Sequence, residues 1–326
     1  MPAKVVFHLP AKQLKTYRSR AHLRVFDRIQ QEVEIRGGHI RAVRRDPRLI
    51  DPSATDWRAV LDDGNLHIIE NGQVRHPNAL NTALAYIPPF WHLDGRGVLC
   101  NSSIAERVYD PRQVRLQPAK AFFQQQRRRL VGNRRSRYNQ KREYEAIPEG
   151  AIAVFLQGGN PEKQGSTHCT AREMLRAVAQ GAENRPVVVK PHPLQPGDAA
   201  MVQALKDAGL DFILTDANIH DILSECAVTV SFNSAVSIEG YLHRKPAILF
   251  GRSDFHHMAE TVEDPADFPV ALQNALARKG GYAKYFYWYF ALNCLSVQGN
   301  GFADRMLAIF GDAGFAPERL GLDWRI

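Results

Sequence analysis

The sequence predicts an α/β protein of two domains, the second of which is a doubly wound domain of the Rossmann type. Its 326 residues suit about two domains of ordinary size. The strand-like runs of the second half are continuously apolar instead of alternating, which is typical of parallel strands covered on both faces. Helical patterns separate these runs at short, regular intervals, and this alternation indicates repeated strand–helix–strand units.

The second half follows that pattern from residue 151 to residue 251. The expected strands are 151–157, 186–190, 211–215, 228–232 and 246–251. The expected helices between them are 170–182, 198–209, 219–227 and 235–245. Ligands of such sheets bind outside the carboxyl ends of the strands, so the residues that follow each strand are the candidates for a site.

The first half predicts a smaller α/β domain. Its expected elements are a strand at 4–10, a helix at 21–38 that ends in two glycines, and strands or loops at 65–72 and 82–90.

Pro148 and Gly150 give the best boundary between the halves, so we expect domains at 1–148 and 149–326. The tail of the second domain predicts two further helices at 284–294 and 302–315.

Cysteine use and hydropathy indicate a protein of the reducing cytoplasm. The four cysteines are scattered without a C-x-x-C pair, which favours free thiols over disulfides or a zinc site. No segment has the roughly 20 apolar residues of a membrane helix. The N-terminus also lacks the apolar core of a secretory signal, so we expect a cytoplasmic location.

The net charge of +8 comes from one segment. Eleven Lys and Arg and no acidic residue lie between Arg112 and Arg142, so the remainder of the chain is net acidic. A basic stripe attracts the phosphates of nucleic acid, lipid head groups or glycans. The residues that we expect to face an acceptor or a membrane are Arg127, Arg128, Arg129, Arg134 and Arg135.

The segment "VVVKPHPLQPG" ends an expected buried strand with Lys190, Pro191, His192 and Pro193. A proline fixes its own backbone and keeps the preceding residue extended, so Lys190 and His192 are held just beyond the strand. An imidazole presented in this way donates to an anionic oxygen or moves a proton. We therefore expect His192 to be catalytic and Lys190 and Pro193 to bind a nucleotide. A surface turn is the competing interpretation.

The segment "SFNSAVSIEG" ends the next such strand and turns directly into a helix. The N–H groups at a helix start suit a phosphate, and Ser231, Asn233 and Ser234 can both cap the helix and bind a ligand. Glu239 lies further along, where it can reach a ribose diol. The competing interpretation is capping alone.

The loop "FLQGGNPEKQGS" follows a third strand and carries Gln157, which we expect to bind the nucleotide, and Glu162. It does not match a Walker P-loop, because no GKS or GKT follows, and a plain connecting loop is the alternative. A weaker polar cluster, "WHLD", contains Asp94. His256 and His257 are adjacent and point different ways in regular structure, so no metal site is predicted.

Taken together, "KPHP", "HDILSECAVTVSFNSAVSIEGYLHRKPAILFG" and "YFYWYF" resemble the capsule polysaccharide biosynthesis and export family over roughly residues 150–300. That family includes transferases that add Kdo from CMP-Kdo to the lipid-anchored linker of bacterial capsules. The resemblance implies a GT-B fold, with two Rossmann-like domains, an active site in the cleft between them and no bound metal. It also implies that His192 contacts the CMP phosphate and that Ser234 lies in the matching serine motif.

One departure concerns the catalytic acid. Kdo transferases of this kind are expected to carry an aspartate in the loop that corresponds to 157–166, and here Glu162 is its only acid. Either Glu162 replaces it, or Asp94 of the first domain serves, or the donor is not CMP-Kdo. The pattern around Ser231 also resembles CDP-glycerol transferases of teichoic acid synthesis, so a cytidine nucleotide is a safer expectation than any one sugar.

We therefore expect a glycosyltransferase of bacterial capsular polysaccharide biosynthesis. Its donor would be a cytidine nucleotide sugar such as CMP-Kdo, its acceptor a lipid-linked molecule or glycan, and it would need no cofactor beyond the donor. An anionic membrane surface is a further expected partner. The alternatives are a CDP-glycerol-type polyol phosphate transferase, an inactive GT-B scaffold and a nucleic-acid-binding protein. Nucleic acid is the less favoured partner, because the basic segment matches no RNA-binding module.

Overall fold

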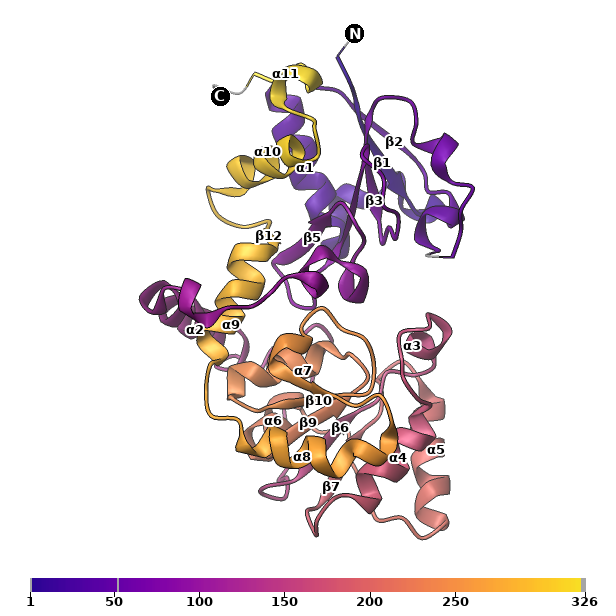
Figure 1. Cartoon of the computed structure of the whole chain (residues 1–326), viewed down its shortest axis with the longest axis vertical. Coiled ribbons are helices and arrows are strands. Elements are labelled where there is room, and N and C mark those ends of the chain that lie inside the picture. The colour runs from indigo at the N-terminus through magenta and orange to yellow at the C-terminus, as the bar shows by residue number, and fades with distance from the viewer. Residues whose placement is uncertain (1, 52, 324–326) are drawn as a thin grey trace. The chain divides into compact units, whose positions relative to one another are not determined.

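The computed structural model describes residues 2–51 and 53–323, which divide into two compact units (Figure 1). Unit 1 consists of Met1–Arg107 and Tyr289–Ile326, and unit 2 consists of Val108–Trp288. Each unit is built around one six-stranded sheet.

The sheet of unit 1 is mostly parallel. Its strand order is β12-β5-β4-β3-β1-β2; β5 pairs in an antiparallel manner with both of its neighbours, β4 and β12, and the other pairs are parallel. The strands are β1 (Val5–Leu9), β2 (Ile40–Arg44), β3 (Leu66–Glu70), β4 (Ala79–Leu84), β5 (Phe90–Asp94) and β12 (Leu295–Ser296).

Helices from both ends of the chain cover the main core of unit 1. These helices are α1 (Arg24–Ile35), α10 (Phe302–Asp312) and α11 (Pro317–Leu320). In α10 the buried residues Phe302, Met306 and Phe310 recur every four positions, which places them on one face, and that face packs into the same core as Phe7 of β1. Unit 1 is therefore complete only with the last helices of the chain.

The sheet of unit 2 is parallel throughout, with the order β11-β10-β9-β6-β7-β8. Its strands are β6 (Ile152–Phe155), β7 (Val187–Lys190), β8 (Ile213–Leu214), β9 (Val228–Ser231), β10 (Ala247–Leu249) and β11 (Ala259–Thr261). Every residue of β6 and β9 is buried, as expected for central strands covered on both faces.

Helices lie on both faces of this sheet (Figure 1). The core on one face includes residues of α4, α5 and α8, and the core on the other includes residues of α6 and α7. The helices of unit 2 are α2 (Leu116–Leu130), α3 (Asn160–Lys163), α4 (Ala171–Gln180), α5 (Pro196–Asp207), α6 (Ile219–Glu225), α7 (Ala235–Gly240), α8 (Phe268–Ala277) and α9 (Tyr282–Phe286).

The strand order contains one reversal. From β6 the chain proceeds to β7 and β8 on one side, and then crosses to β9, β10 and β11 on the other side. The carboxyl ends of β6 and β9 therefore flank a topological switch point, which is where α/β sheets form their ligand crevice.

The predicted elements of the second half are all present, with shifted ends. The expected strand 211–215 is reduced to β8, and the expected helix 284–294 is α9 followed by a π-helical segment, η12 (Tyr287–Leu292). The predicted fold class, a GT-B-like pair of Rossmann-like α/β domains, agrees with the two units.

The division of the chain differs from the expected boundary near residue 148. The chain leaves unit 1 at Arg107 and returns to it at Tyr289, so the tail belongs with the first sheet. The basic segment 112–142 lies in unit 2, because Phe123 of α2 packs edge-on against Phe286 of α9 at 5.9 Å. Both assignments depend on contacts between residues far apart in the sequence, which composition near residue 148 does not reveal.

Candidate functional site

The candidate site lies at the carboxyl edge of the unit 2 sheet. Gln157 follows β6, His192 follows β7 and Asn233 follows β9. Since β6 is paired with both β7 and β9, the three loops are neighbours. The sequence prediction that these motifs gather at one sheet edge agrees with this topology.

Gln157 and Asn233 join the loops on the two sides of the switch point. Gln157 Nε2 donates to Asn233 Oδ1 over 2.9 Å, and Gln157 Oε1 accepts the backbone N–H of Asn233 over 3.1 Å. Asn233 Nδ2 also donates to the Ser166 hydroxyl and to the carbonyl of Arg252. These two predicted nucleotide-binding residues thus hold the loops after β6, β9 and β10 in one arrangement.

Asp198 joins the loops after β6 and β7. Its buried carboxylate accepts the backbone N–H of His192 over 3.1 Å and that of Gly158 over 3.2 Å, both through Oδ2. Gly158 has a φ of +63°, and a Cβ there would lie 2.5 Å from the Gln195 side chain, so only glycine fits. The sequence reasoning missed Asp198, although an acid in the first turn of the helix after "KPHP" is a visible signal.

The hydrogen bonds of His192 select its tautomer. Nδ1 accepts the backbone N–H of Leu194 over 3.2 Å, so a neutral ring carries its proton on Nε2. Burial lowers the pKa of His192, Asp198 opposes this and Arg137 adds to it. The bond to Leu194 therefore leaves Nε2 as the ring nitrogen that can donate a hydrogen bond to a ligand.

Lys190 does not present its charge beside His192. Its Nζ donates to the carbonyl of Ala217 over 2.6 Å, in the connection between β8 and α6. Burial lowers the pKa of this ammonium group. Pro193 is exposed. The prolines of the motif "KPHP" thus position His192, while Lys190 links the end of β7 to the connection between β8 and α6.

The predicted serines act mainly on the protein itself. Ser231 is fully buried, its hydroxyl is 2.8 Å from that of Ser237, and it accepts the N–H of Ser234. Ser234 Oγ accepts the N–H of Val236 and caps α7, which leaves its hydroxyl hydrogen available to a ligand.

Glu239 is buried and does not face solvent as a ribose ligand would. Its Oε1 accepts the Ser136 hydroxyl over 2.9 Å, and its Oε2 has no hydrogen-bond partner among the described residues. Burial raises the pKa of Glu239 to about 7, against the opposing effects of the Ser136 hydrogen bond and the Arg129 charge. Glu239 thus lies buried against Ser136 of the basic segment, and its expected contact with a ribose stays a prediction.

The two candidate catalytic carboxylates differ in their surroundings. Glu162 is exposed, and its Oε1 accepts the N–H of Ala171 at the start of α4. Asp94 lies in unit 1, where Oδ1 accepts the N–H of Arg96 and Oδ2 accepts the N–H and the hydroxyl of Ser103. Both oxygens of Asp94 thus stabilise a local turn.

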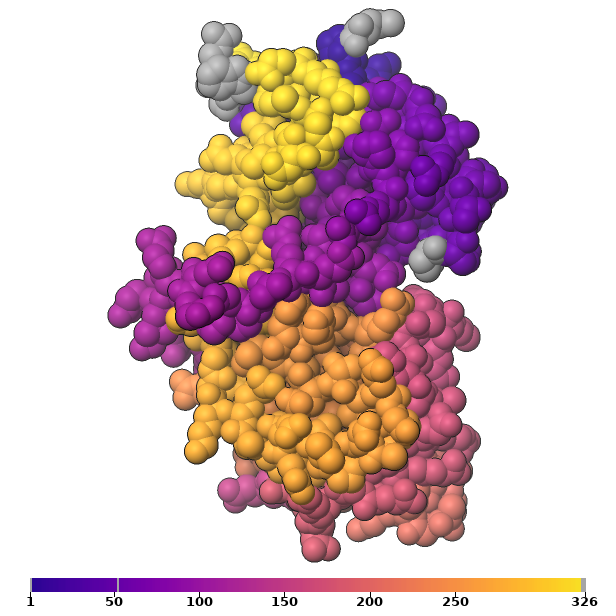
Figure 2. Space-filling view, viewed as in Figure 1, coloured from indigo at the N-terminus to yellow at the C-terminus, as the bar shows by residue number. Residues whose placement is uncertain are grey.

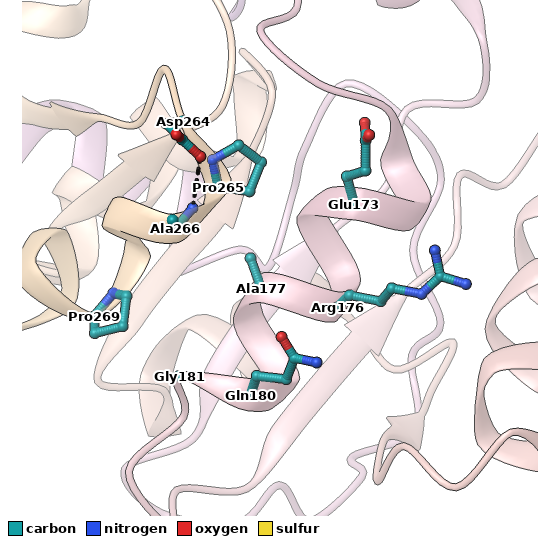
Figure 3. A pocket seen from close by; sticks show the side chains of 9 residues that line it. All are labelled: Glu173, Arg176, Ala177, Gln180, Gly181, Asp264, Pro265, Ala266 and Pro269. Atoms are coloured by element: carbon teal, nitrogen blue, oxygen red, sulfur yellow. Dashed lines mark hydrogen bonds between the residues drawn. The ribbon is translucent and has the colours of Figure 1, made fainter.

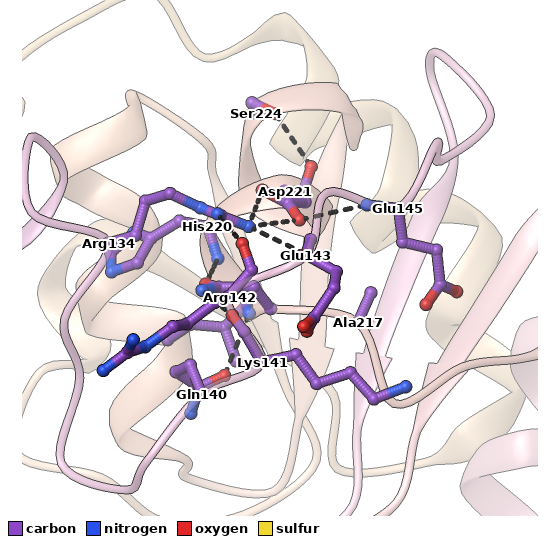
Figure 4. Close-up of polar contacts among 12 residues, drawn as sticks. Arg134, Gln140, Lys141, Arg142, Glu143, Glu145, Ala217, His220, Asp221 and Ser224 are labelled. Atoms are coloured by element: carbon purple, nitrogen blue, oxygen red, sulfur yellow. Dashed lines mark hydrogen bonds and ion pairs between the residues drawn. The ribbon is translucent and has the colours of Figure 1, made fainter.

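The end of the basic segment forms a strap, defined here as residues 131–146. Arg134 Nη2 contacts both carboxylate oxygens of the buried Asp221 at 2.7 and 2.8 Å, and Arg134 also donates to the carbonyls of Arg142 and Glu143 (Figure 4). Removing either partner would leave a half-buried charge without compensation, so this pair fixes the strap firmly.

Further bonds fasten the strap to the same region of unit 2. Lys141 pairs with Asp216, and Thr215 donates to Glu145. The side chain of Asn218 and the backbone N–H of Ile219 bond residues 140 and 141 of the strap. Acids and amides near the end of β8 thus hold a segment that carries no acid of its own between residues 131 and 142.

The five arginines predicted to face an acceptor or a membrane therefore separate into two groups. Arg134 is committed to Asp221, and Arg129 is half-buried with a hydrogen bond from Nε to Gln126. Arg128 and Arg135 have exposed side chains, and Arg127 is partly exposed. Figure 2 shows the surface that α2 contributes to unit 2 at the left of the view, in purple. Its exposed residues Lys120, Gln124 and Arg128 recur every four positions, so one side of the helix is open to solvent.

A surface groove of about 460 Å³ lies elsewhere in unit 2, between α4 and the start of α8 (Figure 3). Two of its polar side chains, Glu173 and Asp264, serve as helix-capping groups. None of the predicted site residues lines this groove, and we assign it no role.

Two features are absent from the described residues. No cluster of three or more His, Cys, Asp or Glu side chains there could hold a metal ion. No described helix is long and apolar enough to cross a membrane.

Residues 115–269 match the family model described as "Capsule polysaccharide biosynthesis protein". The matched segment includes α2, the strap, β6 to β11 and every predicted site residue except Asp94. The predicted resemblance to this family is confirmed by the match. A comparison with curated protein sequences gives no match.

Two solved structures resemble nearly the whole chain. One is the β-Kdo 2,7-transferase of Thermosulfurimonas dismutans KpsC, with 12% identity, a TM-score of 0.56, and coverage of 96% of this chain and 99% of that chain. The other is the β-Kdo 2,4-transferase of the same KpsC, with 13% identity, a TM-score of 0.52, and coverage of 87% and 90%. At these identities the likeness shows the fold, and the predicted fold class is confirmed.

The buried carboxyl of Glu239 predicts a pH dependence of stability. The folded protein holds this proton more tightly than the unfolded chain, whose pKa is near 4.5, so the stabilisation is full below about pH 4.5 and is lost as the pH rises toward 7. Relative to Glu239→Gln, the wild type should lose up to about 3 kcal/mol of unfolding free energy over that range. Denaturant unfolding of both proteins between pH 4 and 8 measures the difference.

Glu263→Gln is the matched control, because Glu263 is an exposed glutamate of the same unit. Its difference from the wild type should stay flat across the range. A flat difference for Glu239→Gln as well would contradict the raised pKa.

Proposed function

We propose that this chain is a glycosyltransferase of capsule-type surface polysaccharide assembly, with a cytidine nucleotide sugar as donor and a lipid-linked or glycan acceptor. The observation that carries the proposal is His192, whose Nδ1 is occupied by the Leu194 amide and whose Nε2 is left to a ligand at the switch-point edge of the sheet, within the segment that matches the capsule family. The fold shared with two Kdo transferases supports it, and Kdo is accordingly the first sugar to test.

The proposed chemistry centres on the donor phosphate. As the bond between sugar and phosphate breaks, negative charge develops on the phosphate oxygens. A donor already aimed at that position lowers the barrier without reorganising. His192 Nε2–H and the Ser234 hydroxyl are the groups proposed to meet these oxygens, and the bonds of Asp198 and Gln157 hold the loops that carry them.

Glu162 is the better candidate for the catalytic carboxylate. Its Oε2 has no hydrogen bond within the described part of the chain, and the side chain is exposed beside the loop after β6. Both oxygens of Asp94, in contrast, already accept hydrogen bonds in a turn. We therefore propose Glu162 for acid or base chemistry and a structural role for Asp94.

The acceptor side of the proposal rests on the exposed face of α2 and the strap. A lipid-linked acceptor is reached from a membrane surface, where each nearby Lys or Arg contributes roughly 1 kcal/mol of attraction to anionic lipid. The exposed Arg128 and Arg135 are placed for such a contact. We propose peripheral docking at the inner face of the cytoplasmic membrane.

The nucleic-acid alternative has less support in the structure than it has in the sequence. The Tyr138 ring, which could stack on a base, lies edge-to-face with the His192 ring at 5.4 Å. Arg134 and Lys141, which could contact a backbone phosphate, pair with Asp221 and Asp216.

We expect cytidine nucleotides to stabilise the protein more than uridine or purine nucleotides. A ligand present at 100 times its Kd adds about 2.7 kcal/mol to stability, which is easily seen as a rise in melting temperature. A thermal-shift screen with CMP, CDP, UDP, GDP and ADP makes the comparison. A clear advantage of UDP or GDP over both cytidine nucleotides would exclude the proposed donor.

We expect His192→Ala to lower turnover strongly and His192→Gln to recover part of it. A glutamine amide can donate a hydrogen bond but cannot serve as an acid, so partial recovery identifies hydrogen-bond donation as the role. Loss of one such donor costs roughly 10²–10³ in kcat. Transfer assays with CMP-Kdo at saturating donor measure the effect, and unchanged melting temperatures show that both variants are folded.

Near-normal turnover of folded His192→Ala would remove His192 from the mechanism. An equal loss in the alanine and glutamine variants would instead favour proton transfer by the imidazole. An inactive scaffold would show nucleotide binding without transfer in every one of these proteins.

We expect the protein to bind anionic vesicles and the double variant Arg128→Gln, Arg135→Gln to bind them roughly 30-fold less tightly, from the loss of two surface cations. Phosphatidylglycerol-rich and phosphatidylcholine vesicles at about 0.1 M salt, where the Debye length is about 10 Å, provide the measurement. The double variant Arg172→Gln, Arg176→Gln removes the same charge from exposed positions of α4 and is the control. A wild type that ignores anionic vesicles would refute docking.

A further inference from the structure

The motif "KPHP" predicts Lys190 as the cation that binds the donor phosphate beside His192. In the structure the ammonium group of Lys190 is bonded elsewhere. Lys190 Nζ donates to the carbonyl of Ala217, in the connection between β8 and α6. Burial lowers the pKa of His192, so the imidazole is a poor source of positive charge for a donor phosphate. A cation from another segment would have to compensate the phosphate charge.

The strap brings one arginine to this position. The Tyr138 ring lies edge-to-face with the His192 ring, with 5.4 Å between centroids and an interplanar angle of 85°. The guanidinium carbon of Arg137 lies over the Tyr138 ring at 5.6 Å from its centroid. His192, Tyr138 and Arg137 thus form a three-member stack that links the loop after β7 to the strap.

Arg137 is also free to bind an anion. Its side chain is exposed, and no carboxylate pairs with it among the described residues. The neighbouring cations Arg134 and Lys141 are committed to Asp221 and Asp216, and these pairs keep the strap, and with it Arg137, in place. The positive charge of Arg137 also lowers the pKa of His192, as expected of a cation close to the ring.

We propose that Arg137 is the phosphate-binding cation of the donor site and that Tyr138 is a positioning residue that holds Arg137 and His192 side by side. The inference rests on the proposed function and extends it by naming the charged group. A guanidinium suits this task, because its planar array of N–H groups matches phosphate oxygens better than an ammonium does. It also complements His192, whose Nε2 is placed to offer a hydrogen bond.

Comparing ligands with and without phosphate separates binding of the phosphate charge from recognition of the cytosine base. CMP, CDP and the nucleoside cytidine differ only in phosphate, so a phosphate ligand affects the first two and leaves the third unchanged. Arg137→Gln should weaken CMP and CDP binding about 10- to 100-fold, as expected for a lost charge-assisted hydrogen bond, and leave cytidine binding within twofold. Isothermal titration of each ligand against folded variants measures the three affinities.

Arg142→Gln is the matched control, because it removes the same charge from an exposed side chain of the same strap. We expect it to keep CMP affinity within twofold. Equal effects of Arg137→Gln and Arg142→Gln, or an equal loss of CMP and cytidine binding in Arg137→Gln, would overturn the assignment. Raising the salt concentration should weaken CMP binding more in the wild type than in Arg137→Gln.

The role of Tyr138 is tested by measuring CMP affinity in a variant that keeps the aromatic ring and in a variant that removes it. Tyr138→Phe should keep CMP affinity, because the edge contact and the surface under Arg137 remain, whereas Tyr138→Ala should lose about as much as Arg137→Gln. The double variant Tyr138→Ala, Arg137→Gln should then be no weaker than Arg137→Gln alone. Additive losses would assign Tyr138 a separate role and overturn its function as a positioning residue.

The two proposals fail in different ways. If the wild type binds CMP and Arg137→Gln binds it equally well, the inference fails and the proposed function stands. If another nucleotide binds better than CMP, the same comparison with that nucleotide and its nucleoside tests Arg137, while the cytidine donor is already excluded. A wild type that binds no nucleotide overturns both.

Discussion

The carboxylate of Asp198 is the constraint on which the candidate site depends. It lies in the first turn of α5, is buried, and accepts backbone N–H groups from the loops after β6 and β7. Two hydrogen bonds to one buried charge are worth more than two between neutral groups, and losing the acceptor would leave two amides unsatisfied. Because Asp198 fixes the backbone of His192, it also fixes the relation of that ring to the Leu194 amide, which decides the tautomer.

The sequence predicts those structural features whose signals lie within short stretches of the chain. The strands and helices of unit 2 are readable because apolar runs and proline-rich ends are short-range patterns, and they correctly place Gln157, His192 and Asn233 at one sheet edge. The direction in which a long side chain points is not local. Lys190 turns to Ala217 and Glu239 is covered by Ser136, and both contacts depend on segments that are distant in the sequence.

The charge of the basic segment shows the same limit of local sequence signals. Taken alone, eleven cations without an acid predict a surface for an external phosphate. The fold supplies part of the counter-charge from within, through Asp216 and Asp221 near the start of α6. Part of the acidic excess in the rest of the chain therefore binds the strap. Only the cations left after this pairing, among them Arg128, Arg135 and Arg137, are available to other molecules.

The passage of the chain from unit 1 to unit 2 and back has a consequence for biosynthesis. Domains generally fold as units while the ribosome is still at work, and the N-terminal one usually comes first. Here the core of unit 1 requires Phe302, Met306 and Phe310, which are made after the whole of unit 2, whereas unit 2 is one uninterrupted stretch. Unit 2 can therefore finish folding first. Until α10 is made, the strands of residues 5–94 have the cover of α1 but lack the cover that α10 supplies, and this is the period in which unit 1 is most exposed to aggregation and to chaperones.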